Sequence, residues 1–199
     1  MKMSIKSLIA IVLTTLTIST AAVASDVTVL SEVKNFNKIN VSGNVEVILV
    51  QSNEEKVQVY NDYYKNNALV QSKNGVLNIS SYEKERLTVV VTFKNIEKLT
   101  ASDNAIVNSY NALSALGLEV NLKHQAVANL NLNTINLNTQ VTGTSNLILE
   151  GSTLSHQANI FNVASVNLNK FTADNTSFAT KNTRVAKTNN DGEFNNLGK

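Results

Sequence analysis

From residue 27 onward, apolar and polar positions alternate with a period of two rather than 3.6. Val45, Val47 and Leu49, for example, are separated by single residues and would share one face of a strand. The same alternation, bounded by turn-forming residues, recurs in the segments 57–59, 69–71, 76–79 and 87–93. This pattern is typical of strands with one buried face, so it predicts an all-β protein.

A hairpin is predicted at Asn74-Gly75, which lies between two short apolar runs. Both residues tolerate the positive φ that a two-residue turn requires. We therefore expect the first third of the chain to form antiparallel hairpins.

After Phe93, apolar residues recur at a regular interval of about 20 positions. One expected inward column contains Ile106, Leu130, Leu147, Val166 and Val185. A second contains Ile96, Leu118, Leu137, Ala158 and Phe178. The first interval of each column is the longest, and we attribute this to an insertion at 111–117. Two columns with one period predict stacked coils that add short strands to parallel ladders, as in a parallel β-helix-like solenoid.

The 31 asparagines of the chain suit such a solenoid. Each coil must turn sharply, and asparagine enters the left-handed region at lower cost than most residues. Stacked amides can also hydrogen-bond between coils. Asn129, Asn131 and Asn146 lie beside column residues and are candidate ligand contacts. A genome rich in asparagine codons would give the same count, and this alternative stays open.

The length of 199 residues suits one domain with a single core. Without cysteine, the chain has no disulfide and no thiolate ligand for a metal. Charged residues make up only 16% of the chain, which argues against nucleic-acid binding through a basic surface. The polar surface is therefore expected to consist mainly of amides and hydroxyls.

Residues 1–24 have the three parts of a secretory signal peptide. Two lysines precede an apolar run at 8–18, and Ala22-Val23-Ala24 supplies the small residues before the expected cleavage between Ala24 and Ser25. The run is shorter than the roughly 20 residues that span a bilayer, so we expect no transmembrane segment in the mature chain.

Cleavage would also change the charge of the protein. It removes Lys2 and Lys6 and leaves 15 basic and 15 acidic residues, so the formal net charge falls from +2 to zero. A neutral surface does not steer charged partners from a distance, so we expect binding through shape and short-range hydrogen bonds.

Several segments resemble a known bacterial family, the auto-transporter adhesin head or GIN domain (DUF2807). VSGNVEVILVQ (41–51) and RLTVVVTFKNIEKLTASDNAIVNS (86–109) resemble its opening, while LEVNLKHQAVANLNL (118–132) and TGTSNLILEG (142–151) resemble its repeated coils. The resemblance implies an exported, right-handed parallel β-helix-like domain over 25–187, in the periplasm or at the surface of a Gram-negative-type bacterium. It also implies an adhesin-like role, and it carries no catalytic residue to this chain.

Neither histidine suggests a catalytic or metal site. His124 and His156 do not share a register in the expected columns, and Glu150 is the one acid between Lys123 and Thr172. Metal and general-base sites need convergent partners, so we expect both histidines in turns or on the surface.

The acids are also dispersed, at one or fewer per coil, and are expected in solvated turns: Asp103, Glu119, Glu150 and Asp174. Carbohydrate-cleaving β-helix enzymes need clustered acids on one face. We therefore identify no catalytic residue, no cofactor and no metal site.

One aromatic cluster contains Tyr60, Tyr63 and Tyr64, with Tyr82 further along the chain. Such rings can form a platform for a sugar or a protein contact, so the first three are candidate ligand contacts. They can equally cover the end of a core.

The last segment, 188–199, is rich in turn formers and is expected to be a disordered polar tail. Three interpretations of function remain. The first is a non-catalytic envelope or cell-surface binding module whose partner is a glycan or an envelope protein. The alternatives are a polysaccharide lyase or hydrolase and a structural periplasmic protein. Oligomeric state and ligand identity stay open.

Overall fold

The computed structural model describes residues 27–61, 68–181 and 184–186, and every regular element among them is a strand. The strands are β1 (Thr28–Val29), β2 (Lys38–Gly43), β3 (Val45–Gln51), β4 (Lys56–Val59), β5 (Ala68–Lys73), β6 (Val76–Ser81), β7 (Leu87–Phe93), β8 (Lys98–Ser102), β9 (Ile106–Ser109), β10 (Leu113–Leu122), β11 (Val127–Val141), β12 (Asn146–Phe161), β13 (Ser165–Lys181) and β14 (Arg184–Ala186). The all-β prediction is confirmed.

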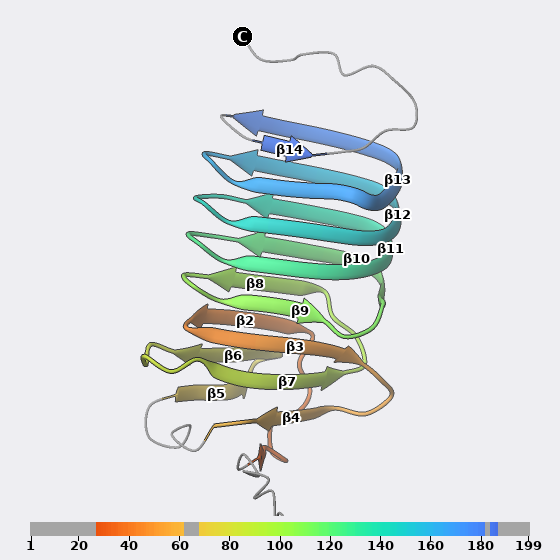
Figure 1. Ribbon diagram of the computed structural model, residues 1–199. Coiled ribbons are helices and arrows are strands. Elements are labelled where there is room, and N and C mark those ends of the chain that lie inside the picture. The colour runs from red at the N-terminus through yellow and green to blue at the C-terminus, as the bar shows by residue number, and fades with distance from the viewer. Residues whose placement is uncertain (1–26, 62–67, 182–183, 187–199) are drawn as a thin grey trace, which may run out of the picture.

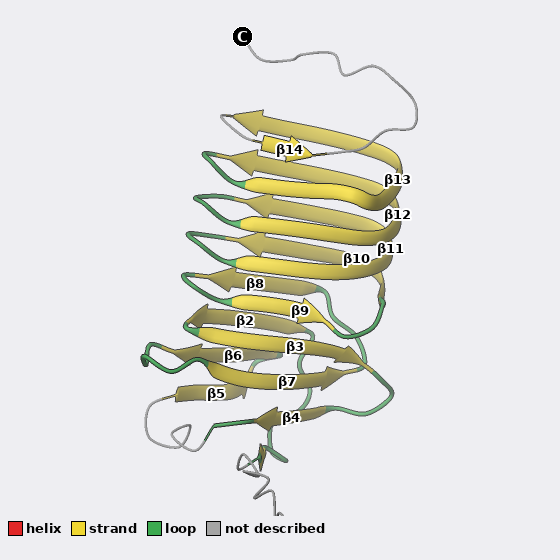
Figure 2. Ribbon diagram, viewed as in Figure 1, coloured by secondary structure: helices red, strands yellow, loops and turns green. Residues whose placement is uncertain are grey.

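All fourteen strands belong to one sheet, which curls so that two rows of strands face each other (Figure 1). One row runs β7-β3-β9 and continues through the first halves of β11, β12 and β13. The other runs β6-β2-β8-β10 and continues through their second halves. All neighbours within these two rows are parallel. Short loops join the rows at one side, and the long strands bend between them at the other (Figure 2).

The core lies between the rows and is built from the inward residue of each alternating pair. Its clearest column contains Val89, Val47, Val107, Ala128, Leu147 and Val166, all 0% exposed. Val185 continues this column through its backbone register with Val166. Closely packed aliphatic side chains of this kind supply most of the stability of such a sheet.

The first predicted column is correct for Leu147 and Val166, with Val185 in backbone register beside Val166, and it is wrong at its start. Val107, not its half-buried neighbour Ile106, faces the core, and Ala128 rather than Leu130 pairs with Leu147. Ala128 and Leu130 share the buried face, so alternation alone does not distinguish them.

The predicted insertion at 111–117 is also wrong. Residues 113–117 belong to β10, where Leu113 pairs with Leu132 and Gly117 with Asn136. With Val107 and Ala128 in the column, the first interval comes close to the later ones, so it needs no insertion.

The second predicted column contains two pairs with the correct register, Leu118 with Leu137 and Ala158 with Phe178, but the inward position is wrong for Phe178, which is 42% exposed. Between these pairs the register is shifted, because Leu137 pairs with His156 and Thr139 with Ala158. Ile96 is buried but precedes β8 and is not part of the ladder.

The predicted hairpin at Asn74-Gly75 is confirmed. These residues join the antiparallel strands β5 and β6 and have φ values of 52° and 77°. Only β1–β4, β4–β7 and β5–β6 are antiparallel pairs among the described strands, however. The prediction that the whole first third is antiparallel is therefore wrong, because β2, β3, β6 and β7 join the parallel ladders.

The short loops between the rows contain a stacked set of residues with positive φ: Gly43, Asp103, His124, Gly143 and Asn162. Gly43 is required at its position, because a Cβ there would lie 2.0 Å from the carbonyl oxygen of Ser81. Asparagine takes this conformation at Asn35, Asn74 and Asn162. Amides also bond between strands as expected, since Asn129 Nδ2 donates to Asn108 Oδ1 at 2.7 Å.

Candidate binding groove

A groove of about 610 Å³ is lined mainly by residues at the start of β10 and near the middle of β11, β12 and β13. The long strands bend from one row to the other along this part of their length (Figure 1). The lining residues of the groove come mainly from four successive strands, β10, β11, β12 and β13: Asn95, Ser114, Ala115, Leu116, Asn133, Thr134, Ile135, Ser152, Thr153, Leu154, Thr172 and Asp174. The groove therefore crosses the strands rather than following one of them.

The bend interrupts the strict alternation of buried and exposed residues. In β11, Ile135 and Asn136 are consecutive exposed residues, and Leu154 and Ser155 repeat this arrangement in β12. A side chain of the alternating core pattern is thereby turned outward at each bend. Ile135 and Leu154 are exposed in phase with the first half of their strands, whereas the alternation of the second half would bury them.

These outward side chains form an exposed aliphatic column. Leu116, Ile135 and Leu154 are 78%, 42% and 52% exposed. They occupy equivalent positions on β10, β11 and β12, because the preceding residues pair as Ala115 with Thr134 and Thr134 with Thr153. The next position, on β13, is occupied by the acid Asp174.

A polar column precedes the aliphatic one on the same strands. Ser114 pairs with Asn133, Asn133 with Ser152, and Ser152 with Thr172. All four side chains are exposed. The groove thus presents one hydroxyl or amide group per strand beside one aliphatic group on three of the four strands.

The residues between the two columns support the groove from beneath. Thr134 and Thr153 are only 5% and 4% exposed, and Thr134 Oγ1 donates to Thr153 Oγ1 at 2.9 Å. At the β10 end, Gln51 fixes Ser114, whose amide donates to Gln51 Oε1 at 2.6 Å, while Gln51 Nε2 donates to the Ser114 carbonyl at 2.9 Å. These bonds preorganise the surface that a ligand would meet.

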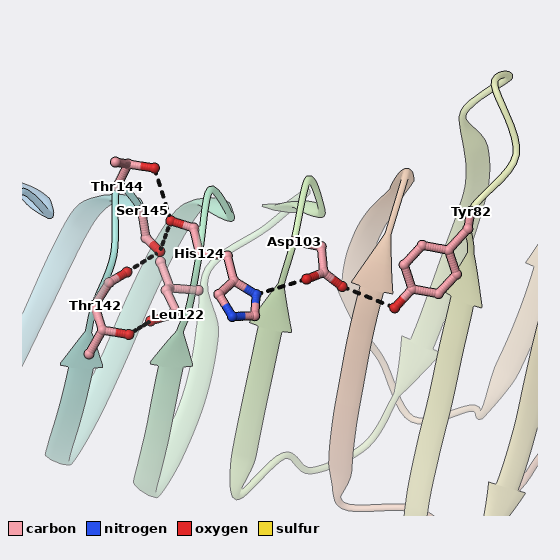
Figure 3. A network of polar contacts seen from close by, with 7 residues as sticks. All are labelled: Tyr82, Asp103, Leu122, His124, Thr142, Thr144 and Ser145. Atoms are coloured by element: carbon pink, nitrogen blue, oxygen red, sulfur yellow. Dashed lines mark hydrogen bonds and ion pairs between the residues drawn. The ribbon is translucent and has the colours of Figure 1, made fainter.

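A second polar feature lies on the opposite side, in the short loops (Figure 3). Asp103 Oδ1 lies 2.8 Å from His124 Nδ1, and the Tyr82 hydroxyl donates to Asp103 Oδ2 at 3.0 Å. Burial would raise the pKa of Asp103, but the hydrogen bonds with His124 and Tyr82 outweigh it and hold the pKa below its usual value. An ionised carboxylate accepts only, so His124 Nδ1 carries the proton of this bond.

This network is connected to the next turn of the stack. The backbone carbonyl of His124 accepts hydrogen bonds from the amide and hydroxyl of Thr144 in the next turn. Among the described residues, no group of three His, Cys, Asp or Glu side chains could hold a metal ion. The Asp103–His124 pair was not predicted from the sequence, although the separation of its two members is close to the repeat.

His124 lies in a turn, as expected, whereas the surface position expected for His156 is wrong. His156 is 1% exposed and occupies the inward position that leucine holds in β10 and β11. Its Nε2 lies 2.9 Å from Thr139 Oγ1, and its ring makes edge contacts with Phe171 and Phe178.

Three of the four dispersed acids lie in strands rather than in turns, namely Glu119, Glu150 and Asp174, so the prediction of solvated turns is wrong for them. Two of the three pair with lysines. Glu119 Oε1 is 2.8 Å from Lys98 Nζ, and Glu150 Oε1 is 3.0 Å from Lys170 Nζ. The hydrogen bond from Lys98 lowers the pKa of Glu119.

The candidate ligand contacts that the structure describes do not line the groove. Asn129, Asn131 and Asn146 belong to the first halves of β11 and β12, and Asn129 is engaged with Asn108. Tyr60 is half-buried after β4, and its amide donates to the Thr88 carbonyl. Tyr63 and Tyr64 lie outside the described residues, as do the expected signal peptide and the polar tail.

A usable sequence signal for the groove did exist. Leu116, Ile135 and Leu154 recur at equal intervals along the chain, and Ser114, Asn133 and Ser152 recur at the same interval. Only inward columns were expected from the sequence, although an aliphatic column with this period can also face outward.

Comparison with known proteins places this architecture in context. A solved "putative adhesin" from Bacteroides fragilis has a TM-score of 0.63 at 16% identity, covering 82% of this chain and 97% of the other. A "putative adhesin" from Parabacteroides merdae has a TM-score of 0.64 at 16% identity, covering 81% and 75%. These likenesses show a shared fold. No curated protein matches the sequence.

Among the described residues, no helix is long and apolar enough to cross a membrane. The family model described as "Putative auto-transporter adhesin, head GIN domain" matches residues 35–183, which is most of the chain. The chain therefore belongs to the GIN domain family (DUF2807).

Proposed function

We propose that this protein is an exported, non-catalytic binding module of the cell envelope or cell surface. The observation that carries the proposal is the groove across β10–β13, an open and preorganised surface of hydroxyl, amide and aliphatic groups. Two solved proteins of the same fold carry the name "putative adhesin", which agrees with a role in binding. A glycan or an envelope protein is the partner class that such a surface suits.

The lining of the groove favours binding over cleavage. Asp174 is the one carboxylate among its lining residues. Glycoside hydrolysis by the usual route needs two carboxyl groups flanking the scissile bond, one as acid and one as base or nucleophile. The alternative, a polysaccharide lyase or hydrolase, would have to place its reaction elsewhere on the molecule.

The proposal includes the maturation and the finer architecture of the chain. Residues 1–24 act as a signal peptide, 25–187 form the binding domain, and 188–199 form a polar tail, in the periplasm or at the surface of a Gram-negative-type bacterium. Parallel ladders and turns stacked at Asp103, His124 and Gly143 support a right-handed β-helix-like solenoid as the architecture.

A binding screen beside a cleavage assay tests this function. The purified mature protein would be offered to glycans and to isolated cell-wall and outer-membrane material, and the same samples would be analysed for newly formed reducing or unsaturated sugar ends. We expect binding without cleavage. Sugar ends that disappear in an acid-to-amide variant would favour the enzyme, and absence of binding to every preparation would favour a purely structural protein.

A further inference from the structure

The groove has a translational repeat that restricts what can bind along it. Neighbouring strands of a sheet are about 4.8 Å apart, so the four polar residues on β10, β11, β12 and β13 span roughly 14 Å. Each step along the groove repeats the same pair of chemical groups, a polar side chain and, on the first three strands, an aliphatic one. A ligand that uses every step must repeat at the same interval.

The exposed aliphatic column is unusual enough to need an explanation. Leu116 and Leu154 are more than half exposed, and with Ile135 they form a continuous line across three strands. Contiguous apolar surface next to polar groups is characteristic of interaction sites. The adjacent polar column requires that a partner also offer hydrogen-bonding groups, since burying its hydroxyls and amide without partners is unfavourable.

We propose that the groove binds a linear, uncharged polysaccharide that lies across β10–β13 with one sugar unit per strand. This inference rests on the proposed binding function and names its ligand class. A pyranose ring has an apolar C–H face and a rim of hydroxyl groups, which match the aliphatic and polar columns. In an extended chain, successive rings advance by a distance close to the strand spacing.

Other polymers fit this surface less well. An extended peptide advances about 3.3 Å per residue and presents the same face about every 6.6 Å, which does not match the strand spacing. Its backbone would add only at a sheet edge, and within the groove β11 and β12 are paired on both sides while Gln51 bonds to the backbone of β10 at Ser114. The second half of β13 pairs only with β12 among the described strands, but a peptide added there would run along β13 rather than across the groove. An acyl chain would leave the polar column without partners, and nucleic acid would need basic residues.

The charge of the groove lining also favours an uncharged polysaccharide. Asp174 is the one charged residue in the lining, and it lies at the β13 end in line with the aliphatic column. A polyanionic polysaccharide would meet repulsion there and no compensating cation among the lining residues. An uncharged chain avoids that repulsion, so its binding should change little with salt concentration.

The experiment measures affinity against ligand length. Titration calorimetry of the mature protein would use uncharged linear oligosaccharides of glucose, mannose and N-acetylglucosamine, from disaccharide to hexasaccharide, with a uronic-acid series and extended peptides for comparison. In one of the uncharged series, affinity should rise with each unit up to the tetrasaccharide and then level off. The uronic-acid oligomers and the peptides should bind more weakly.

A matched pair of variants locates the site. Leu154→Ser removes an aliphatic contact from the middle of the groove, whereas Leu69→Ser removes a side chain of similar exposure, 48% against 52%, on the distant strand β5. The first should weaken oligosaccharide binding roughly tenfold, or about 1.4 kcal/mol, because it removes apolar contact with the ligand. The second should leave affinity unchanged.

The outcomes separate this inference from the function on which it rests. Tighter binding of uronic-acid oligomers or peptides, no increase with length, or equal effects of the two variants would overturn the polysaccharide inference. If envelope material binds but none of the uncharged series does, the inference fails and the binding function stands. If nothing binds, or if the oligosaccharides are cleaved, the proposed function itself fails.

Discussion

Backbone conformation at single turn residues determines how closely the strands can stack. Gly43 has a φ of 83°, and a Cβ added there would come within 2.0 Å of the Ser81 carbonyl oxygen. The equivalent positions on later turns are occupied by Asp103 and His124, whose side chains bond to each other across the stack. At these turn positions the residue therefore either has no side chain or has one that bonds to a residue of a neighbouring turn.

Gly43→Ala should destabilise the protein by more than about 2 kcal/mol, because the left-handed conformation and the steric overlap both oppose the methyl group. Gly117→Ala is the control, since nothing lies within 4 Å of a Cβ at that position. Urea unfolding of the two variants would check this, and equal midpoints would contradict the described turn.

Asp103→Asn should make stability less dependent on pH in the acid range. The pKa of Asp103 in the folded protein lies below its usual value of 3.8, so its ionised form stabilises the fold above that pH. This contribution is lost as pH falls through the lower folded pKa. The melting temperature of the wild type should therefore exceed that of the variant at pH 7, and the difference should shrink below about pH 4. Thermal melts across this range measure it.

The exposed Asp174 is a suitable control for this experiment. Asp174→Asn changes the net charge by the same amount as Asp103→Asn but lies in the groove lining, away from the loop network. If both variants show the same acid dependence, the effect reflects net charge, and the interpretation of the Asp103 network is incorrect.

At the level of the strands, register separates residues that are neighbours in sequence. Leu147 is 0% exposed and pairs with Ala128 and Val166 in the core column, whereas Asn146 is half-buried on the outer side of β12. A shift of one residue would exchange these environments.

Leu147→Asp should therefore prevent stable folding, because an unpaired carboxylate in the core costs several kcal/mol. Asn146→Asp should lower the melting temperature by only a few degrees. Circular dichroism melts of the two proteins would measure the difference, and similar losses of stability would refute the register.

At the level of the whole molecule, the repeat that forms the core also forms the groove. Each long strand contributes one side chain to the inner column and, at the bend, others to the outer surface. Stability and binding are thus distributed over the same strands, and we expect single groove substitutions at exposed residues to alter binding with little change in stability.

The mature protein should begin at Ser25 when it is produced in an exporting cell, because the proposed signal peptide ends with Ala22-Val23-Ala24. Sequencing of the N-terminus of the exported protein tests this. Recovery of protein that still begins at Met1 in a membrane fraction would show that the segment is retained instead.

The sequence by itself determined what depends on local periodicity. Alternation with period two indicated strands, Asn74-Gly75 indicated a hairpin, and the equal spacing of Leu147, Val166 and Val185 indicated their common register. These features are predictable because each follows from residues close together in the chain or from a regular interval.

The tertiary structure decided which residues pair between strands. Where two residues of a strand face the same side, the local sequence does not show which of them is the partner. Ala128 and Leu130 point the same way, so only strand pairing selects Ala128 as the partner of Leu147. The contact between Asp103 and His124 requires neighbouring turns to align. The groove requires the bends, where the alternation shifts phase and Leu116, Ile135 and Leu154 are each followed by a second exposed residue. The physical reason is that ladder pairing joins residues far apart in sequence, and local alternation does not specify that pairing.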